Sequence, residues 1–228
     1  MTAIAKRLAG DGASVAVTYS KGADATSSVG TEIDRGGGKG LAIQADAADA
    51  DAVKNAVERT VATLGRLDVL VNNAGTVIPA PIEETTLEDF DRVFATNVRG
   101  TFVATQAALK HLKPGRRIIM IGSCVGEHVF MPGMGPYAAT KGAVKMFTQG
   151  LARELGARGI TVNNVQPGPI DTDLNPASGE WAAGQKAAVP LDRYGKADEV
   201  AALVAFVAGP ESSYINGANL TVDGGTNA

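Results

Sequence analysis

A tyrosine and a lysine, Tyr137 and Lys141, stand four residues apart near the start of a predicted helix. Side chains at this spacing lie on one face of a helix. An ammonium group beside a phenol stabilises the phenolate, so the pair predicts a tyrosine whose pKa is lowered from about 10 to suit proton transfer. Solvated helices also carry such pairs, and the pair alone is therefore weak evidence for a site.

Ser123 makes the pair more informative, because it follows a strongly apolar segment and precedes Tyr137 by fourteen residues. Glycine and proline lie between them, so the loop could fold back and bring the hydroxyl beside the phenol. The adjacent Cys124 has no histidine at a motif spacing, since His111 and His128 fall in a helix end and a loop. We expect Cys124 to be a small buried residue and not a nucleophile.

Glycine and polar residues recur where the predicted strands end. Glycine lets a ligand approach the backbone closely, and asparagine offers both a donor and an acceptor. The same residue types build ordinary turns, so any one of these loops has a purely structural interpretation as well. Together they predict a ligand site at one edge of a sheet. The five segments are 19–21, 46–47, 72–75, 122–123 and 167–168.

Short β-branched segments alternate with longer helical patterns along the chain. This alternation predicts an α/β fold, a Rossmann-like doubly wound parallel sheet in a single domain spanning residues 1–228. Residues 168–190 lack periodicity and are expected to form a mobile substrate lid with a short helix. Strands are predicted at 15–19, 41–45, 67–71, 117–121, 161–165 and 219–222, and helices at 1–10, 23–35, 49–64, 85–111, 137–155 and 198–208, the fourth helix opening on a capping box of Thr85 and Glu88.

Composition excludes several functional classes. The net charge is −3, and no basic stripe is present to bind nucleic acid. A single cysteine excludes a disulfide framework or a cysteine-cluster metal site, so no metal is expected. No apolar run reaches the roughly 18 residues that span a bilayer, and residues 1–10 lack the features of a signal peptide. These observations predict a cytoplasmic protein without membrane or nucleic-acid partners.

Several motifs, in matching order and spacing, resemble the short-chain dehydrogenase/reductase family, and especially its 3-oxoacyl-acyl-carrier-protein reductases. The resemblance extends from about residue 4 to residue 225. It implies an Asn-Ser-Tyr-Lys tetrad on a Rossmann-like fold that uses NAD(P)(H), and a homo-oligomer that is either a tetramer or a dimer. The matching segments are 72–75 (NNAG), 95–98 with Asn97, Ser123, 137–141 (YAATK), 167–172 (PGPIDT) and 222–225 (VDGG).

The resemblance also implies a role for each tetrad residue. Tyr137 would be the general acid in carbonyl reduction, or the base in alcohol oxidation, and Ser123 would hydrogen-bond the substrate oxygen. Lys141 would lower the pKa of Tyr137 and hold the nicotinamide ribose, while Asn97 would position a water in a proton relay. The remaining cofactor contacts would come from Asp46, Ala47, Asn73, Ala74, Gly75, Pro167, Gly168, Ile170 and Thr172.

The choice between cofactors is predicted from the end of the strand at 15–19. A carboxylate there would accept hydrogen bonds from the ribose of NAD and repel a 2′-phosphate. This chain has Ser20 and Lys21 instead, with no acidic residue before Asp24. A hydroxyl followed by a lysine suits a phosphate, so NADP(H) is favoured over NAD(H); the alternative is a solvated lysine in a turn.

One departure from the family pattern concerns the first strand and the glycine-rich turn that bind the pyrophosphate. Residues 1–10 correspond to the second half of the helix that follows that turn, and no strand precedes them. Because that strand would be central, we expect the strands at 15–19 and 41–45 to lose their partner. An upstream start of the gene, a short form whose sheet closes differently, and filling of the gap by another subunit remain open.

Two functional interpretations follow. The first is an NADP(H)-dependent oxidoreductase that interconverts a ketone and a secondary alcohol, a small-molecule substrate for which a 3-oxoacyl thioester is one candidate. The second is a structural or regulatory homologue with weak or no catalysis. The complete tetrad favours the first interpretation, and the missing pyrophosphate turn favours the second.

Overall fold

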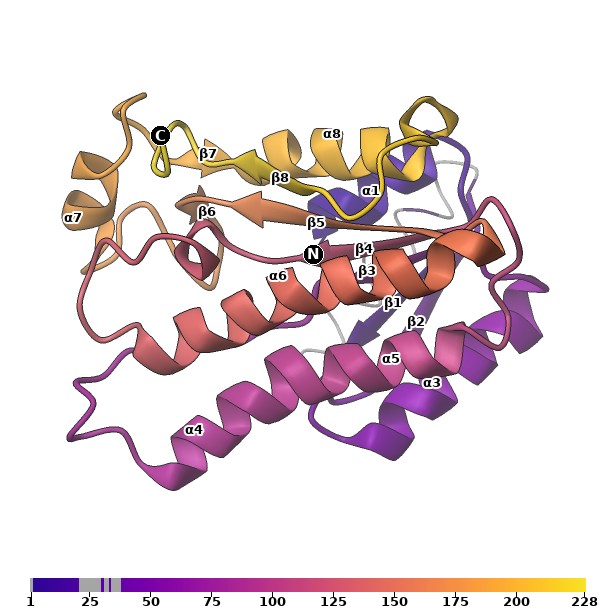
Figure 1. The fold of residues 1–228 in the computed structure, drawn as a ribbon, viewed down its shortest axis with the longest axis horizontal. Coiled ribbons are helices and arrows are strands. Elements are labelled where there is room, and N and C mark those ends of the chain that lie inside the picture. Colours follow the sequence, from indigo (N-terminus) through magenta and orange to yellow (C-terminus); the bar gives the residue numbers. More distant parts are fainter. Residues whose placement is uncertain (1, 21–29, 31–32, 34–37) are drawn as a thin grey trace.

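The computed structural model describes residues 2–20, 30, 33 and 38–228, which form layers of helices around parallel strands (Figure 1). The strands are β1 (Val15–Tyr19), β2 (Gly40–Gln44), β3 (Val69–Asn72), β4 (Arg117–Ile121), β5 (Thr161–Pro167), β6 (Ile170–Asp171), β7 (Gly195–Lys196) and β8 (Asn219–Val222). The helices are α1 (Thr2–Gly10), α3 (Ala50–Leu64), α4 (Leu87–Phe94), α5 (Gly100–Ala108), α6 (Gly135–Leu155), α7 (Ala182–Ala187) and α8 (Ala197–Ala208). The predicted helix at 23–35 falls almost entirely outside the described residues, as do Lys21 and Asp24.

Four parallel strands in the order β3-β4-β5-β8 form the main sheet. One of its two inner strands, β4, is apolar on both faces, as expected for a parallel strand covered by helices on each side. Ile118 and Met120 pack toward α3, α5 and α6, whereas Ile119 packs toward α1 and α8. These two apolar clusters hold the sheet between its helical layers, which confirms the predicted α/β class.

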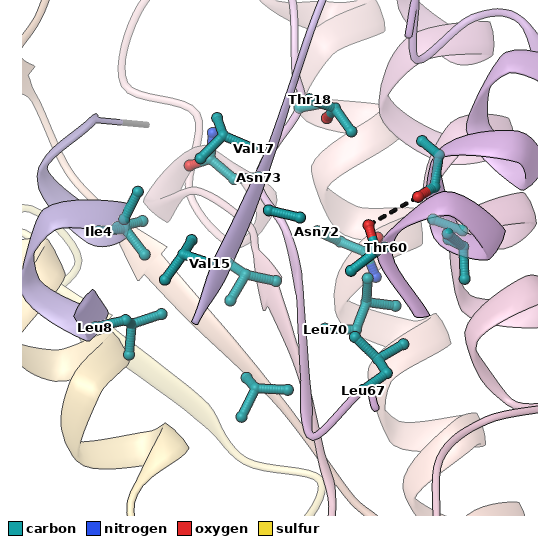
Figure 2. Close-up of a pocket in the computed structure, with 18 of the residues that line it drawn as sticks. Ile4, Leu8, Val15, Val17, Thr18, Thr60, Leu67, Leu70, Asn72 and Asn73 are labelled. Atoms are coloured by element: carbon teal, nitrogen blue, oxygen red, sulfur yellow. Dashed lines mark hydrogen bonds between the residues drawn. The ribbon is translucent and has the colours of Figure 1, made fainter. Parts of the chain in front are cut away.

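The strands β1 and β2 form a separate parallel pair, and the described residues show neither of them bonded to the main sheet. On the side of β1 away from β2, the described residues show no hydrogen-bonded strand, which agrees with the expected loss of a partner there. The expectation that β2 loses its partner is wrong, because all five residues of β2 are in register with β1. A cavity of about 490 Å³ separates β1 from β3 (Figure 2).

Two helix starts show how local sequence sets the elements. The Asp49 side chain accepts from the main-chain N–H groups of Asp51 and Ala52 and so caps α3. The cap of α4 is Thr86, which accepts from the Asp89 N–H at 3.0 Å. The predicted capping box of Thr85 and Glu88 is therefore wrong by one residue, because Thr85 belongs to the preceding turn, where its hydroxyl donates to the Pro81 carbonyl.

The predicted long helix at 85–111 is interrupted. Between α4 and α5 the residues Ala95–Arg99 form a π-helical turn, a local widening that is often found at functional sites. This π-helical turn contains Asn97.

Among the described residues, no helix combines the length and the apolar character needed to cross a membrane.

Candidate active site

Ser123 lies just beyond the carboxyl end of β4, where the backbone leaves the sheet. It is the N-terminal cap of a short 3-10 turn, Cys124–Gly126, and its Oγ accepts from the Val125 N–H at 3.4 Å. The hydroxyl also interacts with the side chains of Tyr137 and Cys124. The predicted approach of Ser123 to Tyr137 is confirmed.

Tyr137 and Lys141 lie one turn apart on α6, with the Lys141 Nζ 5.6 Å from the centre of the tyrosine ring. Burial lowers the pKa of Lys141 to about 8. Burial raises the pKa of Tyr137 to about 12, and its interaction with Ser123 acts in the opposite direction. The predicted lowering of the tyrosine pKa by the lysine is therefore wrong for the protein alone. The Lys141 ammonium donates to the Ile121 carbonyl at 2.8 Å.

Asn97 is buried and joins two segments that are distant in sequence. Its Oδ1 accepts from the Thr76 N–H at 2.8 Å, and its Nδ2 donates to the Thr76 carbonyl at 2.9 Å. The same Nδ2 donates to Thr140 Oγ1 at 3.0 Å. Asn97 thus fixes the loop after β3 against α6, immediately before Lys141. A Cβ placed on Gly75 would lie 3.6 Å from Asn97 Oδ1 and 3.7 Å from Lys141 Nζ, so this loop passes close to both residues.

Thr76 and Thr140 are the site residues that motif matching left without a role. Thr140 is fully buried, and its hydroxyl donates to the Tyr137 carbonyl at 2.7 Å while it accepts from Asn97. Its position between Tyr137 and Lys141 in the sequence is a signal from which a place in the site could have been predicted. No comparable signal marks Thr76, because the contacts with Asn97 are made through its main chain.

A cavity of about 1330 Å³ opens where β1, β2 and β3 end, between these loops and the α4–α5 region. Five of the residues predicted to bind the cofactor lie on its wall, and they are Ser20, Asp46, Ala47, Ala74 and Gly75. Asp46 also stabilises its own loop, since its carboxylate accepts from the Ala48 N–H at 2.9 Å. Asn73 lines the smaller cavity beside β1 instead. Lys21 lies outside the described residues.

The other predicted residues line neither of these two cavities, and they are Asn97, Ser123, Tyr137, Lys141, Pro167, Gly168, Ile170 and Thr172. Gly168 follows β5, where a Cβ would approach Asp223 to 2.7 Å. Ile170 belongs to β6, which pairs with β7, and Thr172 bridges to Asn175. This segment leads to α7, the short helix expected within residues 168–190.

Cys124 is buried, and burial raises its pKa to about 11. A thiol in this state is a poor nucleophile, which agrees with its predicted role as a packing residue. The described part of the chain contains no group of three or more His, Cys, Asp or Glu side chains arranged to hold a metal ion.

Comparison with known proteins gives consistent matches over nearly the whole chain. A family model described as "Enoyl-(Acyl carrier protein) reductase" matches residues 2–227. The "Cyclic-di-GMP-binding biofilm dispersal mediator protein" of Escherichia coli (strain K12) is 40% identical over 222 residues, which cover 97% of this chain and 90% of that protein.

Two solved structures are similar in both fold and sequence. One is a short chain dehydrogenase from Burkholderia cenocepacia J2315 in complex with NADP, with a TM-score of 0.98 and 54% identity, covering 99% of this chain and 92% of that one. The other is a blue fluorescent protein from a metagenomic library in complex with NADPH, with a TM-score of 0.97 and 48% identity, at the same coverage of each chain.

Proposed function

Because the chain belongs to the short-chain dehydrogenase/reductase family, we propose that it is a cytoplasmic NADP(H)-dependent oxidoreductase that interconverts a ketone and a secondary alcohol. The observation that carries the proposal is the grouping of Ser123, Tyr137 and Lys141 at the carboxyl end of β4 and the start of α6. A 3-oxoacyl thioester is one candidate substrate.

The residues of the site suit proton donation to a carbonyl oxygen. With a pKa raised to about 12, Tyr137 is protonated at neutral pH and can act as the general acid through its Oη. The Ser123 hydroxyl, beside the phenol, would donate a hydrogen bond to the same oxygen as negative charge develops on it. Lys141 would stabilise the phenolate left after the transfer, once its ammonium turns from the Ile121 carbonyl toward the phenol.

A dinucleotide suits the described surfaces. The 1330 Å³ cavity at the ends of β1 to β3 is large enough to hold the adenosine half, and Gly75 brings the chain close to Lys141 and Asn97 with no side chain between them. When bound, the cofactor supplies the hydride. Lys141 would then hold the nicotinamide ribose, while Asp46 and Ala47 would contact the adenine. Similarity to structures that contain NADP and NADPH supports the choice of cofactor.

The proposal includes a lid and an oligomer. The lid is formed by residues 168–190, whose exposed Leu174 and Trp181 could close over an apolar substrate. Exposed Phe102 on α5 and Met146 on α6 support assembly through these helices as a dimer or tetramer, to be measured by light scattering. The alternative function, a weakly catalytic structural or regulatory homologue, is less favoured because the tetrad is complete.

The proposal is tested by replacing Tyr137 with phenylalanine. We expect Tyr137→Phe to lower ketone reduction by about 10²- to 10⁴-fold, because the proton donor is lost. NADPH binding, followed by nucleotide fluorescence, should remain within a few-fold of the unaltered chain. The matched control is Tyr214→Phe, since Tyr214 is fully exposed, and it should keep full activity.

Turnover retained in Tyr137→Phe would remove this residue from the acid role. Failure of the unaltered chain to bind NADPH, together with binding by a version extended at its amino end, would place the defect in the pyrophosphate turn. Failure of both versions would overturn the proposed function.

A further inference from the structure

The carbonyl group of Cys124 is the point at which the backbone after Ser123 is held. Its oxygen accepts from the main-chain N–H groups of Glu127 and His128, at 3.0 and 3.1 Å. A third donor comes from far along the chain, because Asn227 Nδ2 lies 2.9 Å from the same oxygen. Residues 123–128, called the Ser123 turn below, are therefore joined to a distant segment by one side chain.

The orientation of the Asn227 amide follows from this contact. A side-chain amide has a donating end and an accepting end, and only the donating end can face a carbonyl oxygen. The accepting end, Oδ1, is buried and has no partner among the described residues. A flipped amide would place this oxygen against the Cys124 carbonyl, so the donating orientation is the favourable one.

Asn227 belongs to a segment, residues 223–227, that is itself held in place. The Asp223 carboxylate accepts from the main-chain N–H groups of Gly225 and Asn227, both at 2.9 Å. The Thr226 hydroxyl donates to the Asp223 carbonyl at 2.7 Å. These bonds close the segment on itself directly after β8, so its backbone presents the Asn227 side chain at a defined position.

Close packing on both sides restricts the movement of this segment further. A Cβ placed on Gly168 would lie 2.7 Å from Asp223 Cα, and a Cβ placed on Gly224 would lie 2.6 Å from Val189 Cγ1. The Leu191 N–H donates to the Gly224 carbonyl at 3.2 Å. The segment can therefore serve as a fixed support for the Ser123 turn.

The opposite side of the Ser123 turn packs directly on α6. A Cβ placed on Gly126 would lie 2.9 Å from the carbonyl carbon of Lys141, so the turn contacts the helix backbone here. Glu127 pairs with Lys145 Nζ at 2.9 Å, one helical turn after Lys141. The Ser123 turn thus lies between α6, which contains Tyr137 and Lys141, and the segment that contains Asn227.

One peptide group connects Asn227 with the hydroxyl of Ser123. The peptide group between Cys124 and Val125 accepts from Asn227 through its oxygen and donates to Ser123 Oγ through its N–H, at 2.9 and 3.4 Å. Because a peptide group is planar, fixing its oxygen also fixes the direction of its N–H. Asn227 therefore acts on the position of Ser123 Oγ without touching it.

We propose that Asn227 is a positioning residue, whose donation to the Cys124 carbonyl aligns the Ser123 hydroxyl with the phenol of Tyr137. Displacement of a catalytic group by about 1 Å can cost about 10²-fold in rate, so a small rotation of this peptide group matters. The effect on catalysis rests on the proposed function. The support of the turn by Asn227 does not, and it can be measured separately.

Amide hydrogen exchange tests the support of the turn without cofactor or substrate. Asn227→Ala should speed the exchange of the Glu127 and His128 amides by about tenfold, because both donate to the carbonyl that loses its side-chain donor. The matched control is Asn216→Ala. Asn216 donates to the Ala152 carbonyl at 3.1 Å, near the far end of α6, so this variant should leave both amides unchanged.

Steady-state kinetics test the alignment of Ser123. The probes are NADPH and ethyl acetoacetate, a small 3-oxoester. Asn227→Ala should lower kcat by about tenfold and change either KM by less than threefold, because the lost interaction acts on the transition state and not on binding. Asn216→Ala should keep the kcat of the unaltered chain, although it loses hydrogen bonds of its own.

Asn227→Asp separates the hydrogen bond from packing, because the two side chains have nearly the same size. An ionised carboxylate cannot donate, whereas a protonated carboxyl can. Burial and the neighbouring Asp223 should raise the pKa of the new carboxyl above its usual value of about 3.9. The kcat of Asn227→Asp relative to the unaltered chain should therefore rise as the pH falls from 8 to 5. The same ratio for Asn227→Ala should stay constant.

Three results would overturn the proposal. One is unchanged exchange of the Glu127 and His128 amides in Asn227→Ala, and another is an equal increase in Asn216→Ala. The third is a kcat of Asn227→Asp that equals that of the unaltered chain at pH 8 or that stays equally low at every pH. No reduction of the ketone by the unaltered chain would count against the proposed function, and the exchange comparison would still decide whether Asn227 supports the turn.

Discussion

Lys141 is buried, and its ammonium donates a hydrogen bond to the Ile121 carbonyl. Burial of this charge makes the free energy of unfolding depend on pH. Its pKa is about 8 in the folded chain, against about 10.4 for an unfolded one. Between these values the unfolded chain binds more protons, so the free energy of unfolding rises as the pH increases from about 8 to about 10. Tyr137 acts in the opposite direction above pH 10, because its pKa is raised.

We expect Lys141→Met to increase the free energy of unfolding at pH 7 by on the order of 2 kcal/mol, because the cost of burying the charge is removed. Urea denaturation between pH 7 and 9.5 measures both this gain and the loss of the pH-dependent rise. Lys145→Met is the matched control, since Lys145 lies one turn later and pairs with Glu127 at 2.9 Å. A pH-dependent rise that persists in Lys141→Met would show that another group causes it.

A second residue-scale prediction concerns cofactor choice. Lys21→Ala should lower the preference for NADPH over NADH by about tenfold, because the proposed 2′-phosphate site would lose one cation. The ratio of the two kcat/KM values measures the change, and Lys113→Ala, remote from the strand ends, serves as the control. An unchanged ratio in Lys21→Ala would remove this lysine from the phosphate site.

At the residue scale, sequence motifs located the chemical groups but not their electrostatics. The positions of Ser123, Tyr137 and Lys141 could be predicted because residue type and spacing are visible in the sequence. The direction of the tyrosine pKa shift could not, because it depends on burial and on the ammonium being held by the Ile121 carbonyl. Both properties arise only when β4 and α6 pack together.

At the scale of elements, the π-helical turn at Ala95–Arg99 holds two loops in place. Its Asn97 is hydrogen-bonded to Thr76 in the loop after β3. The turn is accompanied by a close approach between Gly100 and the loop after β2, where a Cβ on Gly100 would collide with the Ala47 carbonyl oxygen. Arg99 strengthens the same contact by donating to the Ala48 carbonyl at 2.8 Å. Two loops on the proposed cofactor cavity are therefore positioned by one short segment.

Gly100→Ala should lower the free energy of unfolding by about 1–3 kcal/mol, because the helix and the loop must move apart. It should also weaken NADPH binding. Gly150→Ala is the matched control in the interior of α6, where a Cβ would meet nothing within 4 Å. It should stabilise the chain by about 0.5–1 kcal/mol. Equal urea midpoints for the two variants would contradict this account.

The helix and strand positions could be predicted closely because hydrophobic periodicity and turn residues are local signals. The break between α4 and α5 could not, since residues 85–111 carry a continuous helical pattern. The break is accompanied by tertiary hydrogen bonds from Asn97 to Thr76 and Thr140, which lie 21 and 43 positions away. The predicted cap was wrong by one residue because Thr85 and Thr86 are adjacent, and only Thr86 caps the helix.

At the scale of the whole molecule, the sheet consists of two parts with unequal support. The main sheet contributes to two large apolar clusters that include α5, α6 and α8. The β1–β2 pair packs into two smaller clusters with α1 and α3. The predicted doubly wound fold is confirmed as a class, but the separation of β1 from β3 was expected only through comparison with the family.

Unequal support predicts unequal stability. In native-state hydrogen exchange, the amides of Val17 and Ile43 should exchange faster than those of Ile119 and Val165 by about tenfold or more, because fewer apolar contacts hold the β1–β2 pair. Exchange followed by mass spectrometry at peptide resolution is sufficient to see the difference. Uniform protection across both parts would show that the two parts unfold as one unit.

The reactivity of Cys124 in solution can report on openings of the site. It is the one cysteine in the sequence, 2% exposed, and its thiol has a pKa raised to about 11. A thiol reagent therefore modifies the folded chain only after the junction of β4 and α6 opens. The rate at which Cys124 is labelled therefore measures how often the structure opens at Ser123 and Tyr137. A ligand that closes the site should lower this rate.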